Sequence, residues 1–116
     1  MDLYTVQMAQ WRVAQDRGIP LLDTTVKSGA VQVAPTWEMV LGVKSGSLSE
    51  AAYTQQYAQL FEYWYFQDPV FFDRLVRHPV IALGCYCAAG KFCHRHLLVK
   101  HLSHITDVNY LGELQK

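Results

Sequence analysis

The feature that most constrains the fold is an unbroken apolar run, Val80–Cys85, which directly follows His78 and Pro79. Such a run, without polar alternation, is typical of a strand that is covered on both faces. Pro79 disfavours helix in the residue before it, so the helix that precedes this strand is expected to end at His78. A strand of this kind favours a parallel sheet with helices on two sides.

Strands and helices alternate along the chain around this run. Two further strands are expected at Leu3–Gln7 and Ile19–Val26, with a helix over Met8–Arg17 between them. Residues 27–46 are punctuated by Gly, Pro and Ser, so they are expected to be irregular, with a short helix near Trp37–Leu41.

The second half of the chain predicts three helices. Ser47 and Glu50 are spaced as a capping box and predict that a helix begins at Ser47. Asp68 is the expected cap of the next helix, which has Pro69 in its first turn. The first of these helices carries an apolar stripe expected to be core, namely Tyr53, Tyr57, Leu60, Phe61 and Trp64. The last two predicted elements are a helix, Phe92–His104, and a strand, Ile105–Tyr110.

This order of elements predicts one small three-layer α/β domain over residues 1–116. Its sheet is expected to be mostly parallel, with helices on both faces, so that the layering is Rossmann-like. Ligands of such sheets bind beyond the carboxyl ends of the strands. Asp23, Thr24 and Thr25 lie at the end of one predicted strand and Lys27 follows it, whereas Cys85 ends another. If these two strands are parallel, both groups lie at the same edge of the sheet.

Composition and charge argue against several classes of protein. In 116 residues the formal net charge is zero, which does not favour non-specific nucleic-acid binding. No segment reaches the roughly 20 apolar residues that span a bilayer, and no signal peptide is recognised at the start. The three cysteines are odd in number and lie close together, so a disulfide framework is not expected. We therefore expect a cytoplasmic protein without a membrane segment.

Several motifs together are similar to one known family. They are Asp23–Gly29, Ala34–Trp37, Tyr53–Tyr57 and the pattern Cys-x-Cys…Phe-Cys-His-Arg over 85–95. With these motifs the chain resembles domain of unknown function 488 (YeaO-like), most closely its short bacterial and phage members. The resemblance implies a three-layer α/β fold and no defined activity. Many members have a glutamate near the position of Cys87, so no acid or base role is carried over to this residue.

The residues around Cys93 include groups that can bind an anion and groups that can react with a bound molecule. Cys93 is expected in the first turn of a helix, where backbone N–H groups stabilise negative charge, and is the candidate nucleophile. His94 is the candidate acid or base. Arg95 is the candidate partner of a phosphate. The other candidate ligand-binding residues are Thr24, Thr25, Lys27, Trp37, Cys85 and Cys87.

These residues predict a pocket for a phosphate-bearing or nucleotide-like small molecule. Whether the pocket also processes this molecule is open, as are any cofactor and the oligomeric state. One alternative is a phage-type protein that sequesters a nucleotide signal of host defence without catalysis. In that case the anion site and its aromatic walls are needed but the nucleophile is not.

Zinc is a second alternative. The ligand types are present in Cys85, Cys87, Cys93, His94 and His96. Their spacing is not a usual zinc-knuckle pairing, so the sequence-based expectation is that no metal is bound and that Cys85 and Cys87 line the pocket. A redox pair between Cys93 and either other cysteine is also open, although the Cys-x-x-Cys motif is absent.

Overall fold

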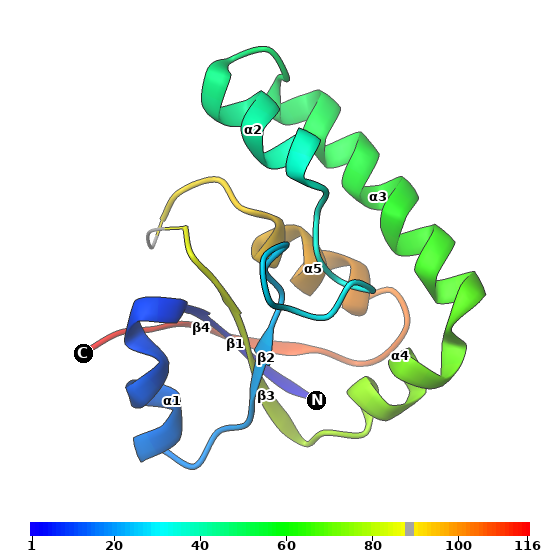
Figure 1. Cartoon of the computed structure of the whole chain (residues 1–116). Coiled ribbons are helices and arrows are strands. Elements are labelled where there is room, and N and C mark those ends of the chain that lie inside the picture. Colours follow the sequence, from blue (N-terminus) through cyan, green and yellow to red (C-terminus); the bar gives the residue numbers. More distant parts are fainter. Residues whose placement is uncertain (88–89) are drawn as a thin grey trace.

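Four parallel strands form one sheet in the computed structural model, which describes residues 1–87 and 90–116 (Figure 1). In chain order the strands are β1 (Asp2–Gln7), β2 (Leu21–Asp23), β3 (Val80–Cys85) and β4 (Asn109–Leu114). Their order in the sheet is β2-β3-β1-β4, and every neighbouring pair is parallel. The prediction that the first three strands are neighbours in one parallel sheet is confirmed.

Helices cover both faces of this sheet. On one face, α1 (Trp11–Asp16) packs through Ala14 against Val6 and Ala82. A short 3-10 helix, Met8–Gln10, leads into α1, and together they replace the single helix predicted over Met8–Arg17. On the other face lie α2 (Trp37–Ser45), α3 (Glu50–Gln67), α4 (Pro69–Val76) and α5 (His94–Leu102). The three-layer α/β prediction is therefore confirmed.

The core between the sheet and the second helical layer is aromatic. Tyr53, Tyr57 and Phe61 of α3 are buried, so the prediction that this apolar stripe belongs to the core is confirmed for these three residues. The hydroxyl of Tyr57 donates to the carbonyl oxygen of Val33 at 2.6 Å, so this buried polar atom is satisfied. Leu98 of α5 is also fully buried in the same cluster. Packing of α3 against α5 thereby holds α5 on the face of the sheet that Ile81 and Leu83 of β3 contribute to.

The predicted cap is confirmed for α4 and is wrong for α3. Asp68 caps α4 as predicted, because its carboxylate accepts the N–H of Phe71 at 3.3 Å. The cap of α3 is Ser49, not Ser47, since the Ser49 hydroxyl accepts the N–H of Ala52 at 3.0 Å. Ser47 lies in the turn after α2, where its hydroxyl forms a hydrogen bond with that of Ser45 at 2.9 Å.

Two predicted strands have the wrong bounds. Ile19–Val26 contains only β2, because the Asp23 carboxylate accepts the N–H of Thr25 at 2.8 Å and turns the chain. The last strand lies at Asn109–Leu114 rather than Ile105–Tyr110. Ile105 instead belongs to the turn that closes α5, where its N–H donates to the carbonyl of Leu102.

In the described residues, no helix combines the length and apolarity needed to cross a membrane.

Candidate functional site

At one point on the carboxyl edge of the sheet, two neighbouring strands are followed by helices on opposite faces. From β1 the chain continues into α1 on one face, whereas from β3 it continues into α5 on the other face (Figure 1). The two strands are neighbours, and their last residues, Gln7 and Cys85, are register partners. In open α/β sheets, the crevice at such a point is the usual location of a ligand site. Cys85 stands at this point.

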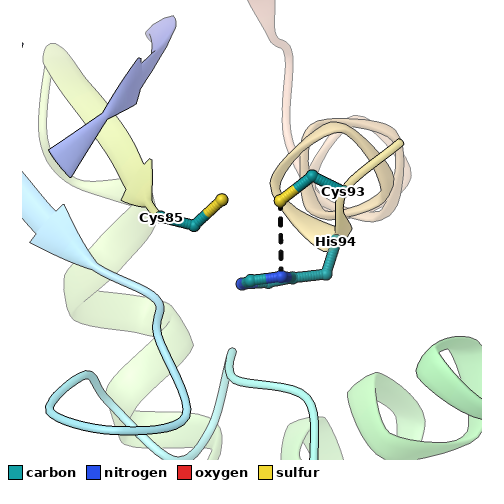
Figure 2. Close-up of side chains that lie close together, drawn as sticks. All are labelled: Cys85, Cys93 and His94. Carbon is teal, nitrogen blue, oxygen red and sulfur yellow. Dashed lines mark hydrogen bonds between the residues drawn. The ribbon is translucent and has the colours of Figure 1, made fainter. Parts of the chain in front are cut away.

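Three side chains with metal-ligating atoms meet there. Cys85 ends β3, Cys93 is the residue before α5, and His94 is the first residue of α5. One ligand atom from each lies within 4.8 Å of the other two. In Figure 2 the two sulfur atoms and the imidazole point toward a common centre. The three side chains are 2%, 3% and 5% exposed, respectively, so the group is shielded from water.

The hydrogen bonds of His94 determine which ring nitrogen faces the sulfurs. Nε2 lies 2.7 Å from the carbonyl oxygen of Thr24, which can only accept, so Nε2 carries the proton. Burial lowers the pKa of His94 to about 4, and the ring is therefore neutral at neutral pH. Nδ1 is left with its lone pair, 3.6 Å from the Sγ of Cys93. His94 thus offers a neutral ligand atom to the cluster.

Thr24 is held in place by the turn after β2. Its N–H donates to the carbonyl of Gly84 at 2.9 Å, which adds one more backbone bond to the β2–β3 pairing. Its hydroxyl donates to the same carbonyl at 2.8 Å and lies 2.9 Å from His94 Nε2. The prediction that Thr24 and Thr25 meet the end of β3 at one edge is confirmed for Thr24.

Arg95 is buried against a residue that the sequence did not indicate. Its Nε and Nη2 donate to the two carboxylate oxygens of Glu113 at 3.2 and 3.1 Å. Its Nη1 donates to Cys85 Sγ at 2.7 Å and to the carbonyl of Cys87 at 3.2 Å. Although burial opposes the charge, the neighbouring thiols and Glu113 raise the pKa of Arg95. Arg95 therefore makes an internal ion pair and supports the end of β3.

Cys87 differs from the other two cysteines because its side chain is exposed. Its ligand atom is not a member of the group of three. Interactions with the thiols of Cys85 and Cys93 lower the pKa of Cys87, and interactions with Cys85 and Cys87 raise the pKa of Cys93.

The other candidates lie apart from this group. The hydroxyl of Thr25 bonds Ser28 at 3.2 Å, and Lys27 is exposed. Trp37 begins α2 and is 51% exposed. Among the described residues, no hydrogen bond joins Lys27 or Trp37 to the cysteines or His94. His96 is outside the group of three ligand atoms. Cys93 precedes α5 instead of lying in its first turn, which corrects its predicted place.

Glu113 is the site residue that sequence reasoning missed. It lies in β4, beyond the predicted end of the last strand at Tyr110, and nothing in its sequence neighbourhood marks it. The only indirect signal is Arg95, because an arginine on the buried side of a helix requires an acidic partner. Its partner became identifiable only once β4 was placed beside β1.

One pair of the donor atoms has the spacing found in a zinc site. A tetrahedral zinc with bonds of about 2.3 Å to sulfur and about 2.0 Å to nitrogen sets these ligand atoms about 3.5 Å apart. The observed distance from Cys93 Sγ to His94 Nδ1 is 3.6 Å.

Comparison of the chain with known protein families, curated proteins and solved structures finds no match. The resemblance stated above therefore stays a prediction, and the site stands on its geometry.

Proposed function

We propose that this chain is a zinc-binding protein whose metal is held by Cys85, Cys93 and His94. The observation that carries the proposal is the meeting of their three buried ligand atoms within 4.8 Å. The proposal replaces the sequence-based expectation that no metal is bound. The spacing in sequence argued against zinc because it is not that of a knuckle. A site built from a strand end and a helix start has no need of that spacing.

The chemistry of the ligands favours zinc among the common metals. Thiolate sulfur combined with imidazole nitrogen suits zinc, whereas magnesium and calcium take oxygen ligands. Charge supports the same assignment. Two thiolates neutralise a divalent cation, and Arg95 with Glu113 forms a pair of zero net charge. A buried centre of this composition is therefore neutral, which avoids the cost of an uncompensated buried charge.

The surroundings match what metal-bound histidine and cysteine require. A ligating histidine usually donates its second ring N–H to a carbonyl or carboxylate, which fixes the tautomer. In this chain the acceptor is the carbonyl of Thr24, 2.7 Å from Nε2. A thiolate is stabilised by donors, and Arg95 supplies one to Cys85. These contacts orient two of the three ligands before the metal arrives.

The anion-binding function remains a prediction with less support. Arg95, its central residue, already donates to Glu113, Cys85 and Cys87. Thr24, a second member, donates its hydroxyl to the carbonyl of Gly84. An incoming phosphate would compete with these internal acceptors. A metal, by contrast, uses the lone pairs that point into the cluster.

Elemental analysis of purified protein, with cobalt titration of the metal-free chain, tests the proposal. We expect about one zinc per chain in the wild type and loss of zinc in Cys93→Ala and His94→Ala. Cobalt should give the visible absorption of a tetrahedral thiolate site. His104→Ala is the matched control, since His104 is exposed and lies after α5. A folded wild type that takes up neither metal would overturn the proposal.

A further inference from the structure

A pocket of about 340 Å³ lies between α4 and the β2 side of the sheet, away from the three ligand atoms. Leu22 of β2 and Ile81 of β3 line it from the sheet, and α4 supplies most of the other lining residues. Ile81 is the second residue of β3 and Cys85 is the last, so the two are about 13 Å apart along the strand. The pocket is therefore separate from the proposed zinc site.

The interior of this pocket is apolar and has the size of a small-molecule site. Besides Leu22 and Ile81, it is lined by Val70, Phe71 and Leu75 of α4. Leu75 and Ile81 are buried, whereas Val70 is 54% exposed, so solvent reaches the pocket beside Val70. The volume falls within the range of about 300 to 1,000 Å³ that small-molecule sites have. The apolar part of a ligand would be removed from water here, next to the ring of Phe71.

The polar side chains of the pocket are Asp68, Arg74 and His78. The two carboxylate oxygens of Asp68 already have donors, namely the N–H of Phe71 at 3.3 Å and Nε2 of Gln32 at 3.0 Å. Arg74 lies six residues after Asp68, which is about 9 Å along α4. Within the described residues, the side chains of Arg74 and His78 make no ion pair and no hydrogen bond. The pocket therefore has a positive end whose donors are unused.

We propose that this pocket binds a small organic acid, whose carboxylate pairs with Arg74 and whose apolar body packs on Phe71. The inference goes beyond the proposed zinc function and does not depend on it. A guanidinium is always charged and binds a carboxylate through two parallel hydrogen bonds. His78 supplies a second donor beside it. The carboxylate of Asp68 repels an anion at the opposite end, so the acid is oriented with its charge toward the end of α4.

Titration of the purified chain with hydrocinnamate and with octanoate, followed by NMR amide shifts, tests the inference. We expect saturable shifts in α4 and at Leu22 and Ile81 with at least one acid. The tighter of the two acids identifies the body as aromatic or aliphatic. Its primary amide has the same shape without the charge, and should bind about ten-fold more weakly. Equal affinity for acid and amide, or no saturable shift with either acid, would overturn the inference.

Two substitutions test the charge and the space separately. Arg74→Gln should weaken binding of the tighter acid about ten-fold, with Arg77→Gln as control, because Arg77 is exposed and outside the pocket lining. Val70→Trp should fill the pocket and abolish binding. Its control is Val31→Trp, at a valine that is 56% exposed and outside the lining. Thermal melts confirm that each variant is folded. Equal affinities in Arg74→Gln and Arg77→Gln contradict the inference, as does a homodimer that Val70→Trp dissociates without any acid binding.

Discussion

His94 Nε2 lies 2.7 Å from the carbonyl oxygen of Thr24, which is 70 residues earlier in the chain. This contact joins the turn after β2 to the start of α5. It also fixes the histidine tautomer and directs Nδ1 toward the cysteines. The Thr24 hydroxyl donates to the carbonyl of Gly84 and so holds Thr24 in place for this contact. The site therefore depends on a turn that supplies no ligand of its own.

Thr24→Val should destabilise the protein by about 0.5 to 1.5 kcal/mol, because it removes the buried hydrogen bond from the hydroxyl to the Gly84 carbonyl, which keeps the N–H of Thr24 as donor. Urea unfolding measures the change. Thr25→Val is the matched control, since the Thr25 hydroxyl bonds Ser28 in a less buried place and its loss should cost less. A larger loss of stability in Thr25→Val than in Thr24→Val contradicts this role.

Glu113→Gln should reduce stability by about 3 kcal/mol, since it leaves the buried charge of Arg95 without its carboxylate partner. Glu62→Gln is the control, because Glu62 is exposed on α3. Chemical unfolding of both variants gives the comparison. If Glu113→Gln is no less stable than Glu62→Gln, the ion pair contributes nothing and Arg95 is available for another role.

Arg95→Lys separates the internal role of Arg95 from its predicted role in binding an anion. Lysine cannot reproduce the two parallel bonds to Glu113, so we expect a lower melting temperature without ligand. Thermal melts with and without candidate nucleotides measure both effects. An unchanged ligand-free melt, combined with loss of a nucleotide-induced shift seen in the wild type, would instead support the anion site.

Removal of the proposed zinc should lower the melting temperature without abolishing the fold. The two apolar cores lie on either side of the sheet and are built from residues outside the cluster. Zinc at a thousand times its dissociation constant contributes about 4 kcal/mol to stability. Melts with and without a chelator show the difference in the wild type. In His94→Ala the chelator should have no effect, and an equal shift there contradicts the site.

Gly29→Ala should be strongly destabilising and should weaken metal binding. A Cβ at Gly29 would lie 2.4 Å from the carbonyl oxygen of Asp23 and 2.5 Å from the nitrogen of Thr25, so the backbone of the turn must move. Gly46→Ala is the control, with a positive φ but open space, and should cost only about 1 kcal/mol. Stability and zinc content are measured together. Equal effects of the two substitutions would show that the turn tolerates the shift.

The sequence by itself determined the layers of this protein and the edge of the sheet where its candidate site lies. Continuous apolar character identified β3, because a strand covered on both faces needs no polar alternation. Parallel pairing then placed Thr24 and Cys85 at one edge. The Cys-x-Cys…Cys-His-Arg block over 85–95 could therefore be predicted as a candidate site before the helices were positioned.

Only the tertiary structure decided what the site contains. The sequence could not pair Arg95 with Glu113, since β4 reaches this edge only through its pairing with β1. Nor could it show that Cys93 and His94 converge on Cys85, because this depends on how α5 packs on α3 and the sheet. Local patterns record which residues are apolar and which turns are favoured. Distances between side chains are set by packing among segments far apart in the chain, and those distances distinguish a metal site from an anion site.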